Sequence, residues 1–265
     1  DAAICLGALT GIDERDSKTN ESVGKTLTDY TTFLKKDGLK GKKIGLWTGC
    51  MGFHFKVDKM VREAVEVMKA QGAEVIEIEK ISEENVGKEA FDVLLYEFKD
   101  GLNKYFDSLG ADAPIKSLEA LIEFNKKDDI ELRYFDQNIL EKAQALGDLN
   151  TPEYKTSLHK MLKACRENGI DKVMNENDLD AIVAPTGAPA WKTDLTIGDN
   201  YIGSSSSPAA RSGYPNITVP MGFINELPVG ISIFGRAWTE GVLLEVAYAY
   251  EQATKHRKAP EFLKD

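Results

Sequence analysis

The sequence has few of the residues that usually mark a metal site or a disulfide framework. Only three cysteines and three histidines occur among its 265 residues. The histidines show no HExxH or HxH spacing, and the cysteines are odd in number and far apart. A zinc site or a disulfide-stapled domain would need closer, paired ligands. We therefore expect no metal ion.

A nucleotide-binding motif is also incomplete. Gly24-Lys25-Thr26 imitates the end of a phosphate-binding loop, but Thr19 stands where the first glycine of GxxxxGK[ST] belongs. We set nucleotide binding aside and expect no other cofactor.

Basic charge and long apolar runs are missing as well. The formal net charge is -10, whereas a nucleic-acid-binding surface is typically basic. No apolar run reaches the roughly 20 residues that cross a membrane, and no basic start precedes an apolar core as in a signal peptide. We expect no nucleic-acid partner and no membrane span. Cytoplasmic localisation is the expectation from composition.

The first half of the chain contains a strand, helix and strand in succession. The segment Lys43–Trp47 (KIGLW) is a candidate strand, Glu74–Ile78 is a second, and Gly72 is a helix-terminating signal before the second. Between them, apolar residues recur on one helical face: Val57, Met60, Val61, Ala64, Val65 and Met68. This spacing predicts a right-handed, parallel βαβ unit.

The remaining elements predict an α/β protein. Residues from about 87 to 177 form a helical block, whose third helix is traced from Phe135 and whose fourth begins at Thr151-Pro152. Short apolar runs at 181–184, 217–219 and 229–234 indicate buried strands. A last helix starts after Thr239-Glu240 and runs until Pro260. We expect one domain over residues 1–265, with a mixed sheet layered between helices.

A loop rich in serine and glycine separates the later strands. Its run Ser204–Ser207 suggests a nucleophile, but a reactive hydroxyl needs a base and an oxyanion hole. The one basic side chain nearby, Arg211, stays protonated, and no GxSxG pattern is present. We interpret the loop as small residues that let the backbone pass close to a neighbour or a ligand.

Several segments together resemble the amidase signature family. They are LDAIVAPTGAPA, PAARSGYPNITVPMGF, LPVGISIFGRAWTEGVLLEVAYAYEQAT and HRKAP, in that order. Earlier segments are similar too: LKGKKIGLWTG, YEFKDGLNKYF, SLEALIEFN and FDQNILEKAQALGDLNTPEY. The resemblance covers essentially the whole chain. It implies an α/β/α fold and action on the carbon–nitrogen bond of carboxamides.

The resemblance implies catalytic residues that this chain does not match. The resemblance implies that family members use a nucleophilic serine, a second serine on a cis peptide and a lysine base. Those positions belong to a signature region upstream of Asp1, so we assign no catalytic residue. The chain opens without Met, in what reads as a helix. We expect it to be the C-terminal part of the family fold, an incomplete half.

The resemblance also implies that two loops border the acyl-binding pocket. The expected substrate-binding residues are Pro185, Thr186, Gly187, Ala188, Gly203, Ser204, Ser205, Ser206 and Ser207. The expected function is the substrate-pocket half of an amidase-like hydrolase, inactive alone. Expected partners are a small-molecule amide and either a missing N-terminal half or a second copy of the chain. Two alternatives stay open: a non-catalytic binding module, or a subunit that completes a separate catalytic chain.

Overall fold

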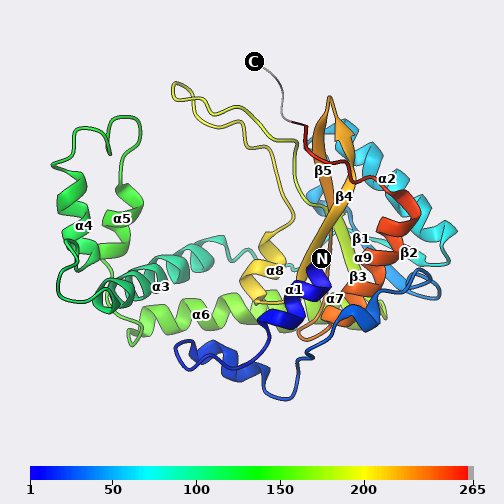
Figure 1. The fold of residues 1–265 in the computed structure, drawn as a ribbon, viewed down its shortest axis with the longest axis horizontal. Helices are drawn as coiled ribbons and strands as arrows, with labels where there is room; N and C mark the ends of the chain where they lie inside the picture. Colours follow the sequence, from blue (N-terminus) through cyan, green and yellow to red (C-terminus); the bar gives the residue numbers. More distant parts are fainter. Residues whose placement is uncertain (262–265) are drawn as a thin grey trace. The chain divides into compact units, whose positions relative to one another are not determined.

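The structure is a computed structural model, and it describes residues 1–261 (Figure 1). Its contacts divide the chain into two compact units. The first comprises Asp1–Glu83, Cys165–Thr193 and the stretch from Asp199 onward, and the second comprises Glu84–Ala164 and Asp194–Gly198. The single-domain interpretation of residues 1–265 stays a prediction.

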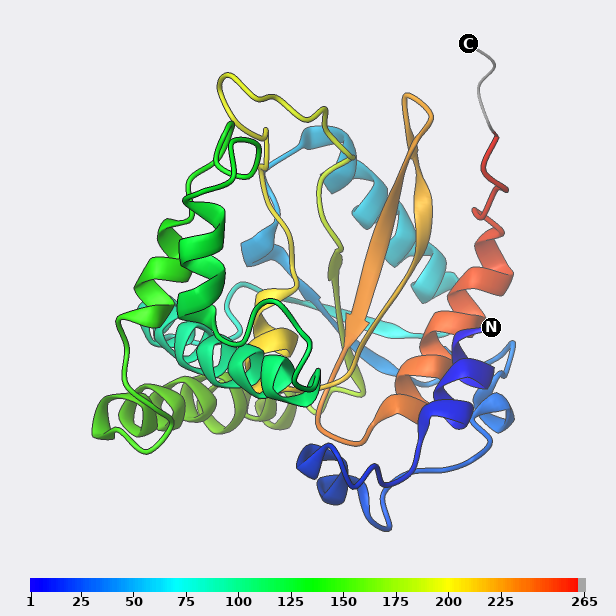
Figure 2. The same cartoon turned by 60° about the vertical axis from the view of Figure 1, so that its left-hand side comes forward.

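The first unit is built on a five-stranded sheet of order β2-β1-β3-β5-β4. The strands are β1 (Lys43–Trp47), β2 (Glu74–Ile78), β3 (Ala181–Pro185), β4 (Asn216–Ile224) and β5 (Leu227–Phe234). β1 pairs in parallel with β2 and β3, whereas β5 pairs antiparallel with β3 and β4. Figure 2 shows the β4–β5 hairpin in orange beside the last helix in red. The mixed sheet and the parallel βαβ unit are confirmed.

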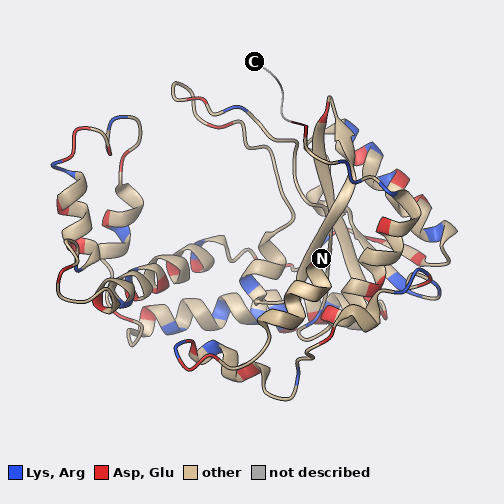
Figure 3. Ribbon diagram, in the orientation of Figure 1, with Lys and Arg blue, Asp and Glu red and all other residues tan. Residues whose placement is uncertain are grey.

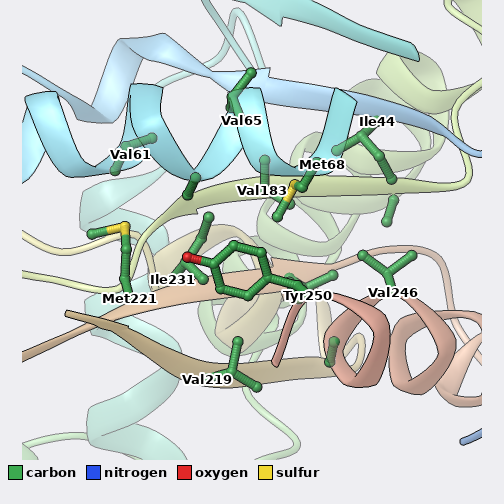
Figure 4. Packing of buried hydrophobic residues seen from close by; sticks show 14 of the residues in the cluster. Ile44, Val61, Val65, Met68, Val183, Val219, Met221, Ile231, Val246 and Tyr250 are labelled. Atoms are coloured by element: carbon green, nitrogen blue, oxygen red, sulfur yellow. The ribbon is translucent and has the colours of Figure 1, made fainter. Parts of the chain in front are cut away.

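Helices cover both faces of this sheet. They are α1 (Ala2–Leu9), α2 (Phe55–Ala70), α7 (Asp171–Glu176), α8 (Ser207–Ser212) and α9 (Glu240–Thr254). Charged residues occur along the length of α2 (Figure 3), while its apolar stripe packs with α9 in a core on one face of the sheet. The ring of Tyr250 lies there among Val219, Met221 and Ile231 (Figure 4).

The opposite face of the sheet has its own core. Ile182 of β3 and Phe234 of β5 are fully buried and pack in one cluster with Ile170 and Met174, which lie immediately before and within α7. Apolar side chains of the sheet therefore point to both of its faces, as expected for strands buried on two faces. The predicted α/β class, with a mixed sheet between helices, is confirmed.

The longer segment of the second unit, Glu84–Ala164, is mainly helical. It contains α3 (Gly87–Ser108), α4 (Leu118–Asn125), α5 (Asn138–Gln144) and nearly all of α6 (Pro152–Cys165). Leu95, Leu118, Ile122 and Ala143 form its small core. The predicted helical block is confirmed, and its fourth helix begins at the proline as expected.

Two predicted helix boundaries are wrong for local reasons. Phe135 is exposed and lies outside α5, which begins at Asn138. The Asp136 carboxylate accepts a hydrogen bond from the Asn138 backbone N–H at 3.1 Å, a local turn that competes with helix before that point. The last helix ends at Thr254 instead of running to Pro260. Lys255 follows it with a φ of 52°, in the left-handed conformation that terminates helices.

The strand 217–219 is longer than predicted. β4 runs from Asn216 to Ile224 and includes Pro220, which breaks the apolar run in the sequence. β4 is the last strand in the sheet order, so Pro220 lies on an edge strand, where a missing N–H is tolerated. The pairing register with β5 shifts between Pro220 and Gly222, which marks a β-bulge.

Glu245 of α9 joins this helix to the lysine-rich segment before β1. Its carboxylate accepts a hydrogen bond from Lys35 at 2.7 Å and lies 3.3 Å from the Lys42 ammonium. Burial alone raises the pKa of Glu245, but hydrogen bonds and charges from both lysines outweigh it, so the pKa is lowered. A lowered carboxyl pKa adds stability above the unfolded pKa of about 4.3, and this contribution disappears as pH falls through the folded pKa.

We expect Glu245→Gln to lower the free energy of unfolding at neutral pH by about 1 kcal/mol, because both ion pairs are lost. Urea unfolding measured from neutral pH to about pH 3 should show a smaller loss of stability in this variant than in the wild type. Glu14→Gln, at an exposed position, is the control and should follow the wild type. Equal acid sensitivity in all three proteins would contradict the assignment.

Candidate functional site

The two loops expected to line a pocket lie side by side. Gly187 and Ser204 form an isolated antiparallel bridge. The Ala188 N–H donates to the Gly203 carbonyl at 3.3 Å, and the Ser205 N–H donates to the Thr186 carbonyl at 3.3 Å. Residues 15 to 19 positions apart in the sequence therefore meet where β3 ends, as expected when a strand end and a small-residue loop share one edge.

A glycine makes one of these approaches possible. Gly203 has a φ of 152°, in a region that L side chains rarely adopt. A Cβ atom at this position would lie 2.8 Å from the Phe53 ring. Phe53 was not among the predicted site residues. It follows β1 at the same end of the sheet and therefore borders the loop from another strand.

A chain of hydroxyl groups lies beneath the first loop. Thr186 Oγ1 lies 2.6 Å from Thr218 Oγ1 and 2.9 Å from Ser232 Oγ. The Thr218 hydroxyl donates to the Ile231 carbonyl at 3.3 Å. Each hydroxyl carries one proton, so the direction follows: Ser232 donates to Thr186, and Thr186 donates to Thr218. The chain ties the end of β3 to β5 and β4.

The neighbouring strand leaves room for these hydroxyls. A Cβ atom at Gly230 of β5 would lie 2.6 Å from Thr218 Oγ1 and 2.9 Å from Thr186 Oγ1. The Thr186 N–H also donates to the Gly230 carbonyl at 2.9 Å. Thr218, Gly230 and Ser232 were not predicted as site residues. The facing pair Thr218 and Ser232 could have been found from the hairpin register, had the bulge been known.

If this hydroxyl chain is present, substitutions at two of its members should have non-additive effects on the free energy of unfolding. Thr186→Val should lower the free energy of unfolding by about 1 to 3 kcal/mol, because the buried Ser232 hydroxyl loses its acceptor. Ser232→Ala should cost about 1 kcal/mol or less. The double variant should be more stable than Thr186→Val alone, since no buried donor is then left unpaired. Urea unfolding of the three variants checks this order, and simple additivity would contradict the chain.

The serines of the second loop pair mainly with one another and with a tyrosine. Ser204 Oγ lies 2.9 Å from the Tyr201 hydroxyl and 3.3 Å from Ser206 Oγ. Ser205 is 1% exposed, and its hydroxyl has no hydrogen-bond partner among residues 1–261. Within the described residues, the partners of Ser204 and Ser206 are hydroxyls, not lysine, histidine or carboxylate groups. This arrangement does not generate a nucleophile.

An aromatic pair adjoins these serines. The rings of Trp191 and Tyr201 are 5.8 Å apart at an angle of 73°, an edge-to-face contact. Both side chains are largely exposed. Since Tyr201 also reaches Ser204, the pair is connected to the loop that bridges Gly187.

The Cys50 thiol follows β1 at the same end of the sheet as these loops. Burial raises the pKa of the Cys50 thiol to about 12, and this thiol donates to the Trp47 carbonyl at 3.3 Å. It therefore stays protonated and unreactive at neutral pH. In the part of the chain that the structure describes, no group of three or more His, Cys, Asp or Glu side chains could hold a metal ion. Likewise, no helix among residues 1–261 is long and apolar enough to cross a membrane.

The fold is that of an α/β protein, and its candidate site gathers small residues and hydroxyls at the end of the central strands. The amidase family model matches residues 1–244. The chain belongs to the amidase family.

Individual relatives match this chain along nearly its full length. A probable amidase of Arabidopsis thaliana is 33% identical over 275 residues, covering 99% of this chain and 48% of the relative. A glutamyl-tRNA(Gln) amidotransferase subunit of Clostridium botulinum is 29% identical, covering 96% and 53%. The crystal structure of the peptide amidase of Stenotrophomonas maltophilia is 37% identical with a TM-score of 0.90, covering 99% and 53%. The chain thus spans about half the length of these relatives.

Proposed function

We propose that this chain forms the substrate-pocket half of an amidase-like hydrolase that cleaves the carbon–nitrogen bond of a carboxamide. The observation that carries the proposal is the meeting of Thr186–Ala188 with Gly203–Ser207 at the end of β3. Backbone groups and hydroxyls gather there, as in sites that orient a small polar group. In the reaction, water adds to the acyl carbon and the amine leaves, giving a carboxylic acid and an amine or ammonia.

We propose that the chain does not catalyse this reaction by itself. Acyl transfer needs a nucleophile next to a base. In the described residues Ser204 and Ser206 contact hydroxyls, and Ser205 is buried. The nucleophile and base would then come from sequence that corresponds to the other half of the relatives' length.

A peptide amide is the substrate class that the similarities favour. The peptide amidase of Stenotrophomonas maltophilia has the higher identity of the two bacterial relatives described above, and its TM-score is high. The exposed Trp191–Tyr201 pair beside the loop offers apolar contact to a side chain of such a ligand.

A second candidate function is a subunit that completes a separate catalytic chain. The observation that favours it is the similarity to an amidotransferase subunit, since that relative is named as part of an assembly. Co-purification with a chain that carries a Gly/Ser-rich signature and a lysine would support this candidate. A non-catalytic binding module is the third interpretation, and it shares the binding prediction below.

Ligand binding tests the pocket assignment. Acetyl-phenylalanine amide added at millimolar concentration should shift the backbone amide resonances of residues 186–188 and 203–207 in the isotope-labelled chain. The matching free acid is the control, and it should shift them less because a carboxylate replaces its terminal carboxamide, which removes that group's N–H donors. Shifts confined to other parts of the chain, or equal shifts with the acid, would refute the pocket assignment.

A further inference from the structure

The helix α8 begins where the serine loop of the candidate site, Gly203–Ser207, ends. The Ala210 N–H donates to the Ser206 carbonyl at 3.0 Å, so the first helical hydrogen bond starts inside that loop. α8 (yellow in Figure 1) has only six residues, Ser207–Ser212. A helix shorter than about 12 residues is at best marginally stable by itself in water. The position of α8 therefore depends on the groups of the fold that hold it.

Arg166 holds the C-terminal end of α8. Its Nε–H donates to the Ser212 carbonyl at 2.7 Å. The last carbonyls of a helix have no partner within the helix, and a cation near them is favoured by the helix dipole. Gly213 follows in the left-handed conformation with a φ of 70°, and its N–H donates to the Ala209 carbonyl at 2.9 Å. The end of α8 is thus held from outside as well as from within.

Tyr214 ties the chain after α8 to the start of α7. Its hydroxyl donates to the Asp171 carboxylate at 2.7 Å, and the Arg166 guanidinium lies 5.6 Å from the centre of its ring. The ring also packs against the core cluster that contains Ala209 of α8. Burial, together with the hydrogen bond and the negative charge of Asp171, raises the pKa of Tyr214 to about 12. The phenol therefore stays a hydrogen-bond donor at neutral pH.

Arg166 and Asp171 reach this region together because the chain between them departs from a regular α-helix. Arg166–Ile170 is a π-helical turn with a kink at Gly169, and the Asp171 N–H donates to the Arg166 carbonyl, five residues earlier. Residues five apart in a regular α-helix lie about 140° apart around its axis, whereas a π-helical turn brings them closer to one face. Such distortions are frequent at functional sites.

We propose that Arg166, Asp171 and Tyr214 are positioning residues for the serine loop. They hold the C-terminal end of α8, and α8 fixes the loop that precedes it, so that the Ser205 N–H meets the Thr186 carbonyl at 3.3 Å. They act through α8 and not by contact with a ligand. The inference rests on the proposed function for the ligand alone, because the placement of the loop is a property of the chain.

Hydrogen exchange on the full chain tests this placement without a ligand. Tyr214→Phe keeps the ring and removes the hydrogen bond to Asp171. We expect exchange of the Ser205 amide to become at least about tenfold faster, while the amide of Val183 in β3 changes less than about twofold. Arg166→Met, which removes the donor to the end of α8, should act in the same way. An unchanged Ser205 rate, or equal acceleration at Ser205 and Val183, would overturn the proposal, because the contacts would then serve overall stability only.

Two further variants separate positioning from the general loss of a hydrogen bond. Asp171→Asn keeps an oxygen that accepts from Tyr214, so Ser205 exchange should stay near the wild-type rate, whereas Asp171→Ala should match Tyr214→Phe. Tyr154→Phe is the matched control, because the Tyr154 hydroxyl donates to the Glu97 carboxylate at the same 2.7 Å within the other compact unit. Acceleration at Ser205 in Tyr154→Phe, or equal effects of the two Asp171 variants, would contradict the proposal.

Binding of acetyl-phenylalanine amide separates this inference from the proposed function. If the wild type binds it at the two loops, Tyr214→Phe should raise the Kd at least about fivefold and Tyr154→Phe should leave it unchanged. Equal affinity of the wild type and Tyr214→Phe would overturn the positioning role. If the wild type does not bind the amide, the proposed function fails, and the exchange rate at Ser205 still decides whether these residues position the loop.

Discussion

Replacing Ile231 with alanine should lower the free energy of unfolding by about 3 to 4 kcal/mol. Ile231 lies in β5, is fully buried, and pairs with Pro185 on one side and Val219 on the other. It belongs to the cluster between the sheet and the helices α2 and α9 (Figure 4). Truncation would leave a cavity that strands held from both sides cannot close.

Urea unfolding followed by circular dichroism measures this effect. Ile197→Ala is the matched control, because Ile197 is 87% exposed and its loss should change stability by less than about 0.5 kcal/mol. If the two variants lose the same stability, the core assignment of β5 is wrong.

Replacing Gly49 with alanine should cost about 2 to 4 kcal/mol. Gly49 lies in the turn Thr48–Cys50 directly after β1. An added Cβ would overlap the carbonyl oxygen of Glu79 and approach Trp47 Nε1 to 2.9 Å. The carbonyl belongs to the backbone, so relief requires a shift of the chain after β2 and not a side-chain rotation.

The control for this substitution is Gly101→Ala in α3. No atom lies within 4 Å of a Cβ built at Gly101, and alanine favours a helix over glycine by about 0.5 to 1 kcal/mol. The two glycine-to-alanine changes should therefore have opposite signs in thermal or urea unfolding. A neutral result at Gly49 would contradict the close approach of the two strand ends.

The strands β1 and β2 were predictable as short segments bounded by turn signals, and the structure places them at Lys43–Trp47 and Glu74–Ile78 as expected. β1 has a buried apolar centre, whereas β2 carries Glu74 and Glu77 and is buried only at Ile78. The apolar residues of α2 recur on one helical face, and this is the face that the structure buries. Burial in these elements depends on local pattern, which is why sequence periodicity was sufficient.

The helix α8 and the full length of β4 were not predictable from local pattern. α8 occupies six residues in a serine- and glycine-rich segment without an apolar stripe. β4 contains Pro220, which argues against a regular central strand and fits an edge strand or a β-bulge, and in the described residues it lies at both. The position of a strand in the sheet is a property of the tertiary fold, so the sheet edge could not be seen in the sequence.

The candidate site was predictable only at the level of loops. The small residues around Gly187 and Gly203 indicated close backbone approach, and the two loops do meet. The hydroxyl chain required the register of three strands and a bulge to be known. Asn225-Glu226, between two apolar runs, was a signal in the sequence for the β4–β5 hairpin. Their φ values of 48° and 69° fit a tight turn.

Amide hydrolysis by the purified 265-residue chain tests the central claim most directly. The chain is proposed to supply a pocket without the nucleophile, so its turnover of acetyl-phenylalanine amide should equal the rate without protein. Addition of a serine-directed covalent inhibitor should then change nothing. Turnover well above that rate, abolished both by the inhibitor and by Ser204→Ala or Ser206→Ala, would contradict the account.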